Sequence, residues 1–480
     1  MSRSRRHIPA RERGDPATGD FARIAQPEAS AMYNPIRALS RRRPANALRV
    51  ALLLALPVGA SAQQSMPPVL RLGDLYRVAE RSSPRLGVAR EIARAAEARI
   101  PGSRRPPDPQ LQLGWMNYSL PGLRPMAPLG MTQLQLMQMI PVAGKLRLAG
   151  RAASWESRAA AERVGDARWE ARTQVAMAFY DLYRTDRSLE VADETRRLVA
   201  DIARAARSMY AVGSGSQADV LRAQVEIARM DEDIVRMRAM RSAMAARLAV
   251  ALTIEDTSFA TPALPAFPEA LPSLDSLQRL ALAERPMLRA GAAELRAADA
   301  STALADREIW PDVTVGVQYG QQRGEMGTER MGSLMIGASI PVFARSRQLA
   351  MRDEAQAMRA MAAADLDAMR AETRGRVAER YADLLRARRL LALYETTILP
   401  QAQAAVTSAL ASYRVGGTTF MALLDDQMTV NRYRQESYAL RAEQGKALAE
   451  LEMLVGRELV DADSVQPVDV AASAAKGVTP

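Results

Sequence analysis

The chain has 480 residues, of which 48% are hydrophobic and only 5% aromatic, and its formal net charge is +11. The hydrophobic fraction excludes wholesale disorder, and the dominance of Ala, Arg, Leu and Met is typical of long packed helices rather than of a mixed globular enzyme. Residues 1–62 hold eleven Arg and four acids, which leaves 54 basic and 50 acidic residues for the remainder. That small excess comes without a nucleic-acid-binding motif, so we expect no nucleic-acid partner.

Two residue types that carry much enzyme chemistry are almost absent. The chain has no Cys, and its single His, His7, lies near the N-terminus. A disulfide framework, a thiol nucleophile, a lipid-anchoring Cys, a Ser or Cys catalytic triad and a His-based zinc site are excluded on this ground. An enzyme would need acid/base chemistry by Asp, Glu or Tyr alone, and no carboxylate pair stands in a pocket-like context. We therefore expect no enzyme activity, no cofactor and no resident metal.

Residues 1–62 have the layout of an export leader. Arg41, Arg42, Arg43 and Arg49 precede the apolar stretch 50–60, and Ser61-Ala62 ends it as a small-residue cleavage site. This pattern predicts a secretory signal peptide that is cleaved after Ala62, with Met32 as a second candidate start. The alternative, an internal transmembrane helix, fits less well because the apolar run is short of about 20 residues. No later segment offers about 18 uncharged apolar residues.

The rest of the chain is a duplication. Matching segments recur at an offset of 200 to 203 residues, which indicates two copies of one unit. The matches are 72–86 with 274–288, 107–115 with 309–317, Ile140-Pro141-Val142 with Ile340-Pro341-Val342, and Tyr210-x-Val212-Gly213 with Tyr413-x-Val415-Gly416. We expect a first repeat over 63–260, a Pro-rich linker over 261–273, a second repeat over 274–458 and a flexible tail over 459–480.

Each repeat begins with a helix and continues with alternating strands. Helical spacing covers about 85–104 and 287–308, and period-2 alternation predicts hairpins over about 109–141 and 310–342. In the second hairpin Val313, Val315, Val317 and Tyr319 alternate with small or polar residues. Strands of about ten residues with one apolar face suit either a tilted transmembrane strand or a soluble sheet with one wet face. Alternation alone does not separate these two alternatives.

Very long helical hairpins follow the strands. No proline interrupts 144–209, a helix of about 100 Å, and a second helix covers about 217–252. The second repeat has the same plan over about 346–413 and 419–458, with one Pro400 that should bend the helix locally. Helical hairpins are therefore predicted over 144–252 and 346–458, and the fold class is mostly α with a small β part.

The returning helix of each hairpin shows heptad spacing. In the first repeat the rows are Val220, Ile227, Ile234, Arg241, Leu248 and Ala223, Met230, Met237, Met244, Ala251. This pattern is typical of coiled-coil packing. The equivalent rows in the second repeat are Leu423, Val430, Ser437, Gln444, Leu451 and Asp426, Tyr433, Leu440, Ala447, Leu454. Their polar members predict that the second hairpin buries this stripe less fully.

The leader, the duplicated unit, the Ile-Pro-Val strand ends and the two Tyr-x-Val-Gly turns together resemble the outer membrane efflux protein family of TolC. The resemblance covers nearly all of 70–458. It implies a homotrimer in which each protomer gives four strands to a 12-stranded β-barrel in outer-membrane lipid, continued by a hollow α-helical barrel in the periplasm. It also implies a passive exit duct served by a periplasmic adaptor (membrane fusion) protein and an inner-membrane pump, RND-type or other. The strand alternatives are thereby resolved in favour of the membrane.

The segment "MTQLQLMQMIPVAGKLRLAGRAA" (131–153) more narrowly resembles the CusC/CzcC-like heavy-metal efflux branch, where Pro-x-x-Gly-Lys follows the second strand. Heavy-metal cations or drugs are the cargo that this resemblance implies. Members of the branch often carry an acylated Cys. This chain has none, so lipid anchoring is not carried over.

The resemblance places functional residues in the two hairpin turns. Adaptor contact falls on Val212, Gly213, Val415 and Gly416, where Gly allows a positive φ and close approach of another helix. The constriction that closes the periplasmic mouth falls on Tyr413, Asp425 and Asp219. A further acidic position of the family falls on Ala422, and its basic gate residue on Thr418, so the gate is altered. Ser216-x-x-Asp219 also reads as a helix cap, and Asp426 competes with Asp425.

Two alternatives stay open. Met116, Met126, Met131, Met137 and Met139 cluster around the first hairpin, and their soft thioethers could contact Cu(I) or Ag(I). Because Met230, Met237 and Met244 lie in the coiled-coil rows, the favoured interpretation is that Met acts as an apolar filler. The alternative to an efflux duct is a periplasmic coiled-coil adaptor or scaffold without a membrane span.

Overall fold

Two copies of one series of elements follow each other in the chain. The computed structural model describes residues 69–119, 121–122, 124–126, 130–324 and 327–466, so the predicted signal peptide lies outside the described residues. The first copy comprises α1 (Leu72–Ser82), α2 (Pro84–Ser103), β1 (Gln110–Met116), β2 (Tyr118–Ser119), β3 (Arg124–Pro125), β4 (Met131–Ile140), α3 (Lys145–Ala211) and α4 (Gln217–Leu252). The second comprises α5 (Leu274–Glu284), α6 (Pro286–Arg307), β5 (Val313–Gly324), β6 (Gly327–Ala338), α7 (Gln348–Leu393), the π-turn η1 (Tyr394–Ile398), α8 (Leu399–Arg414) and α9 (Phe420–Val455).

The repeated residues begin equivalent helices. Pro84 and Pro286 stand in the first turns of α2 and α6, where a missing N–H costs nothing and the fixed φ suits a helix. The Ser83 hydroxyl accepts a hydrogen bond from the Leu86 N–H, and Ser273 caps α5 in the same way through the Ser276 N–H. The short helices α1 and α5 therefore end where the matched prolines begin the next ones.

Both hairpins join one antiparallel sheet. Its strand order is β1-β4-β5-β6, so β4 of the first repeat pairs with β5 of the second. The register places Leu113, Leu134 and Tyr319 in one row across three strands. The neighbouring row holds Gln112, Gln135, Gln318 and Ser333. One side of the sheet is thus an apolar face and the other a polar face.

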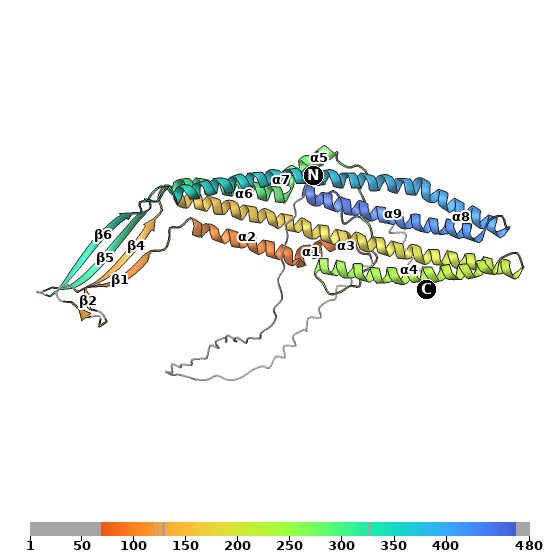
Figure 1. Ribbon diagram of the computed structural model, residues 1–480, viewed down its shortest axis with the longest axis horizontal. Helices are drawn as coiled ribbons and strands as arrows, with labels where there is room; N and C mark the ends of the chain where they lie inside the picture. The colour runs from red at the N-terminus through yellow and green to blue at the C-terminus, as the bar shows by residue number, and fades with distance from the viewer. Residues whose placement is uncertain (1–68, 120, 123, 127–129, 325–326, 467–480) are drawn as a thin grey trace, which may run out of the picture. The chain divides into compact units, whose positions relative to one another are not determined.

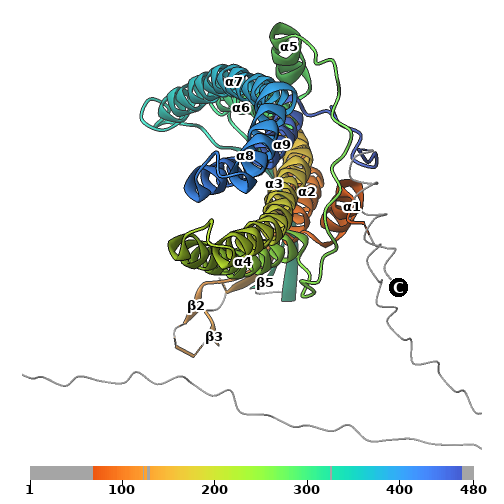
Figure 2. The same ribbon diagram turned by 90° about the vertical axis from the view of Figure 1, so that its right-hand side faces the viewer.

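The long helices pack in a continuous layer around α3. It contacts α4 and α9 in the half that ends at the hairpin turns, and α2 and α6 in the half nearer the strands. Figure 1 shows the sheet at one end of these helices and the two turns at the other, and Figure 2 shows α4, α3, α9 and α8 following one another along a curve. The buried residues of α3 include Val175, Phe179, Tyr180 and Tyr183, which form the centre of the main core.

The seam predicted for the first hairpin is confirmed. Ala223, Met230, Ile234 and Leu248 are buried in α4, and the other members of the two rows are at least partly covered. Arg241 interrupts the row at an ion pair: its Nε donates to Asp186 Oδ1 over 2.6 Å, and its Nη2 donates to the Phe259 carbonyl. The ion pair with Asp186 and the hydrogen bond to the Phe259 carbonyl thus satisfy the charge of Arg241 within an otherwise apolar row.

The prediction for the second hairpin is wrong. Ser437 and Gln444 are buried in α9, with 7% and 6% of their surface exposed, and α9 buries residues on more than one stripe. The reason is that α9 lies between α3 on one side and α7 and α8 on the other. A helix with neighbours on two sides buries its polar interruptions too, whereas heptad analysis assumes one partner.

Pro400 interrupts the second long helix as expected. The helix passes from α7 into the π-turn Tyr394–Ile398 and resumes as α8, with Pro400 in its first turn. Proline removes one N–H and its ring crowds the carbonyl four residues earlier, so the wider π-turn relieves that crowding.

The first part of the predicted flexible tail, residues 459–466, packs onto the rest of the chain. Leu459 and Val460 donate their N–H groups to Glu452 Oε1, Asp463 pairs with Arg77, and the Gln466 N–H donates to the Leu264 carbonyl. The buried Glu452 carboxyl and the packed linker hold residues 459–466 in place. Residues 467–480 lie outside the described part.

No helix in the described ranges has the length and apolar content needed to cross a membrane.

Candidate functional site

The first hairpin turn is a tight five-residue connection between α3 and α4. Gly213 has a φ of +79° and donates its N–H to the Tyr210 carbonyl over 3.0 Å. Ser216 ends the turn, and its hydroxyl accepts the Ala218 N–H over 3.0 Å. The left-handed conformation explains why Gly stands at this position, since a side chain there would strain the backbone.

The second turn repeats this geometry between α8 and α9. Gly416 has a φ of +76° and donates to the Tyr413 carbonyl over 3.1 Å, while the Thr419 hydroxyl accepts the Ala422 N–H. Val212 and Val415 are 75% and 83% exposed, and an added Cβ at Gly213 or Gly416 would meet nothing within 4 Å. Each turn therefore presents an apolar side chain beside open backbone.

The two hairpin ends pack against each other through one cluster of side chains. It contains Val199, Ile202, Ala203, Ala206, Ala223, Tyr413, Phe420, Leu423 and Leu424 from α3, α4, α8 and α9. Tyr413 is only 4% exposed and stacks edge to face with Phe420, with 6.0 Å between ring centroids, whereas its counterpart Tyr210 is 49% exposed. The two repeats thus place equivalent tyrosines in opposite environments.

The structure brings Tyr413 and Asp219 together across the repeats. Burial raises the pKa of the Tyr413 hydroxyl, and the negative charge of Asp219 raises it further. A phenol that stays protonated can donate a hydrogen bond to a carboxylate. Asp219 lies in the first turn of α4, where its negative charge suits the helix dipole.

Asp425 does not join this contact cluster. Its side chain is exposed on α9, whereas the competing Asp426 is partly covered. In the first repeat the matching position is Arg222, which is also exposed. Of the two neighbouring acids, Asp425 is therefore the one whose carboxylate can face solvent.

A cavity of about 430 Å³ lies between α3, α8 and α9, next to the hairpin ends. Its charged lining residues are Asp201, Arg414 and Arg434, and Arg434 also pairs with Glu194 over 2.5 Å. Sequence reasoning missed these residues, because the matched turn motifs stop short of them. No spacing within one helix predicts a cavity that three helices enclose.

Lys145 is another residue whose role the sequence did not reveal. It is 5% exposed, and its Nζ donates to the Trp310 carbonyl and to Asp312 Oδ1, both over 2.9 Å, with Glu308 at 3.4 Å. The Pro-x-x-Gly-Lys segment thus ties the start of α3 to the link between α6 and β5. The signal was present in the motif, but its partners are about 165 residues away in the other repeat.

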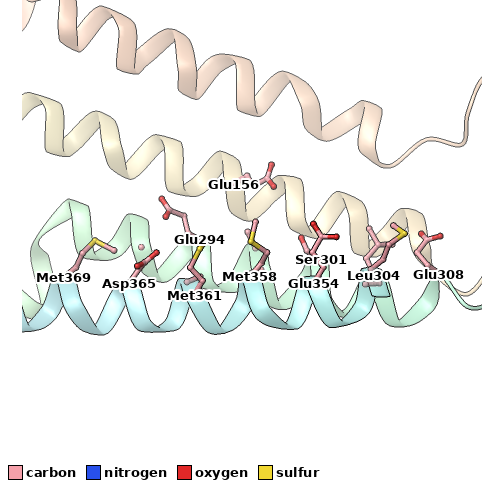
Figure 3. A pocket seen from close by; sticks show the side chains of 17 residues that line it. Glu156, Glu294, Ser301, Leu304, Glu308, Glu354, Met358, Met361, Asp365 and Met369 are labelled. Carbon is pink, nitrogen blue, oxygen red and sulfur yellow. The ribbon is translucent and has the colours of Figure 1, made fainter. Parts of the chain in front are cut away.

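A larger cavity, about 570 Å³, lies against α6 and α7 (Figure 3). Carboxylates and thioethers line it: Glu156, Glu294, Glu308, Glu354, Asp365, Met351, Met358, Met361 and Met369. Met358 and Met361 are 53% and 52% exposed, so this apolar strip of α7 is uncovered in the single chain. Within the described ranges, no group of three or more His, Cys, Asp or Glu side chains is placed to hold a metal ion.

Comparison with known proteins agrees with this architecture. The family model "Outer membrane efflux protein" matches residues 75–253 and 277–457, one match for each repeat. The cobalt-zinc-cadmium resistance protein CzcC of Cupriavidus metallidurans is 24% identical over 307 residues, covering 60% of this chain and 68% of that protein. This match agrees with the heavy-metal branch that residues 131–153 indicate.

Solved structures share the fold. The outer-membrane channel OprN superposes with a TM-score of 0.70 at 20% identity, covering 81% of this chain and 90% of that one. The outer membrane protein VceC of Vibrio cholerae gives 0.69 at 18% identity, over 81% and 96%, and CusC gives 0.68 at 16%, over 81% and 92%. With three quarters of its length matched by the family model in two consecutive copies, this chain belongs to the outer membrane efflux protein family.

Proposed function

We propose that three copies of this chain form the outer-membrane exit duct of a tripartite efflux system. The observation that carries the proposal is the single sheet built from both repeats. Among the described strands, β1 and β6 each pair on one side only, so their outer edges have free N–H and C=O groups. In lipid these groups must find partners, and three four-stranded sheets joined edge to edge into a 12-stranded barrel would supply them.

The apolar face of the sheet supports a lipid environment. Its outward side chains include Leu111, Leu113, Trp115, Leu334 and Ile336, which are 54% to 74% exposed. A soluble monomer rarely leaves so continuous an apolar surface in water. The uncovered methionines of α7 likewise favour a neighbouring copy packed against α6 and α7.

Transport in this proposal is passive, and the hairpin turns meet the partners. A periplasmic adaptor contacts Val212, Gly213, Val415 and Gly416, and an inner-membrane pump, RND-type or other, delivers the cargo. The name of the CzcC relative, a cobalt-zinc-cadmium resistance protein, supports metal cations as cargo. The pump takes up the cargo, so the choice of cargo is made there.

Fractionation and electrophoresis test the proposal. We expect the protein in the outer-membrane fraction as a trimer that requires detergent and dissociates only on heating, and we expect it to conduct ions in planar bilayers. Recovery as a soluble periplasmic protein would favour the coiled-coil scaffold instead. A conducting trimer is an outcome that the scaffold alternative does not allow.

The gate residues give a second test. We propose that Asp425 forms an acidic ring at the periplasmic mouth and that Tyr413 and Asp219 hold the two hairpin ends together. Asp425→Ala should weaken block by added divalent cations about tenfold, because a ring of three carboxylates raises the local cation concentration. Single-channel recording with cation titration measures it.

Asp426→Ala is the matched control, since this partly covered carboxylate lies one residue away. We expect it to leave cation block unchanged. Equal block in the wild type and in Asp425→Ala would remove Asp425 from the constriction.

Tyr413→Phe, which keeps the ring and removes the hydroxyl, should increase the fraction of time that the channel is open if the interaction with Asp219 holds the mouth closed.

A further inference from the structure

The polar face of the sheet has an unusual composition. Its positions across the four strands are Gln110, Gln112, Gly114, Met116, Met131, Gln133, Gln135, Met137, Met139, Thr314, Gly316, Gln318, Gly320, Gln322, Glu329, Met331, Ser333, Met335 and Gly337. No Leu, Ile, Val or aromatic residue occurs among them. Every methionine of the four strands lies on this face, and none lies on the apolar face.

Apolar filling does not account for this segregation. A filler is chosen for volume and flexibility, and Met should then replace Leu on either face. In α4 that is observed, because Met230 lies in the buried seam among Ala and Ile. In the sheet the apolar face uses Leu, Ile, Val and aromatics instead. The property that separates Met from Leu, and that suits a water-facing surface beside Gln, is the thioether sulfur.

Glycines allow the methionines to approach one another. Met137 and Met335 lie two strands apart on either side of Gly316, at a Cα separation of about 10 Å. A Cβ on Gly316 would lie 3.1 Å from Met137 Cγ and 3.6 Å from Met335 Cε, so both side chains reach over the same glycine. Gly320 is covered in the same way, since a Cβ there would lie 3.2 Å from Met131 Sδ, and Met331 pairs with it directly.

Polar neighbours complete the surroundings of these thioethers. Gln135 Nε2 lies 3.9 Å from Met335 Sδ, and Gln318 Nε2 donates to Gln133 Oε1 over 2.5 Å. Glu329 is the one charged residue among the face positions given above. Met137 and Met335 are partly covered, whereas Met116, Met139 and Met331 are 40% to 46% exposed. The sulfurs are therefore accessible from the polar side.

We infer that the polar face of the sheet is a binding surface for soft cations, such as Cu(I) or Ag(I), with methionine thioethers as ligands. Soft thioethers select soft metal ions, and neutral ligands hold them less tightly than thiolates do. The chain has no Cys, and its one His lies at position 7, so thioethers are the soft ligands that remain. The inference rests on the proposed duct, because three copies would turn this face toward one shared water-filled space.

A set of isosteric substitutions tests it. Met131→Leu, Met137→Leu, Met331→Leu and Met335→Leu are combined in one variant of the full chain, which keeps apolar volume and removes the sulfurs. Met230→Leu with Met237→Leu in the α4 seam is the matched control. Each purified protein is titrated with silver nitrate by calorimetry, and sulfur coordination is read from X-ray absorption.

We expect saturable Ag(I) binding with sulfur ligands in the wild type and in the control, and affinity lowered at least about tenfold in the sheet variant. Equal binding by the sheet variant, or no saturable binding by the wild type, would overturn the inference. Trimer formation and silver-free conductance are measured on the same samples. A wild type that conducts but binds no Ag(I) refutes this inference alone, whereas a wild type that forms no channel refutes the proposed duct.

Discussion

Gly445→Ala is expected to lower the free energy of unfolding by about 3 kcal/mol. A Cβ at Gly445 in α9 would lie under 3.0 Å from Cε1, Cζ and Cδ1 of the Tyr180 ring in α3. Tyr180 is 1% exposed and stacks edge to face with Phe179 at 5.3 Å, so the ring has no free space into which it can move. The added methyl group must therefore push α3 and α9 apart, and thermal unfolding followed by circular dichroism in detergent measures the loss.

Gly375→Ala is the matched control. Gly375 lies on the exposed side of α7, and a Cβ there would meet nothing within 4 Å. Alanine in an open helical position should stabilise the chain by about 0.5 to 1 kcal/mol, because glycine loses more backbone entropy on folding. The two substitutions are chemically identical, so a shift of the same sign and size in both would show that α3 and α9 are not in close contact at Gly445.

The second large effect is a pH dependence of stability centred on Glu452. This side chain is 4% exposed, and burial raises its pKa from 4.5 to about 7, although it accepts the Leu459 and Val460 N–H groups. The folded state therefore favours the protonated carboxyl. Its stabilising contribution is complete below pH 4.5 and is lost as the pH rises through about 7. A shift of this size corresponds to roughly 3 kcal/mol between pH 4.5 and pH 8.

Glu452→Gln should remove this dependence. The amide oxygen can accept the same two N–H groups without carrying a charge, so the variant should exceed the wild type in stability above pH 7. Denaturant titrations at a series of pH values give both curves. Glu436→Gln on the exposed side of α9 is the control and should retain the slope of the wild type. A flat wild-type profile would mean that the Glu452 carboxyl is not protonated in the folded chain.

The order of elements could be predicted because each leaves a local pattern. Alternation placed the four strands of the main sheet, the absence of proline placed α3, and the matched Tyr-x-Val-Gly segments placed both turns. The two-residue strands β2 and β3, which pair with each other in the connection between β1 and β4, were not predicted. The burial of α9 could not be predicted in this way. Ser437 and Gln444 look like solvent-facing interruptions until α3 and α7 are both in place, and those contacts join residues far apart in the chain.

The candidate site shows the same limit. The two turns share the Tyr-x-Val-Gly motif, yet Tyr413 is buried and Tyr210 is half exposed, because Tyr413 packs with Phe420 and Leu423 beside α3. The sequence pattern groups only the methionines around the first hairpin. Only the pairing of β4 with β5, which joins the two repeats, places Met137 and Met335 over one glycine.

The two arms have equal lengths. The arm of the first repeat is the 67-residue helix α3, and the second arm runs the same distance in sequence from Gln348 to Arg414 despite its π-turn and proline. The extra residues of the second repeat stand instead in the connection between β6 and α7. A helix changes length by about 1.5 Å per residue, so deleting one helical turn from a single arm would set the turns at different heights. The two long helical segments must therefore keep the same length. An insertion or deletion in one of them has to be matched by an equal change in the other if the two turns are to stay level.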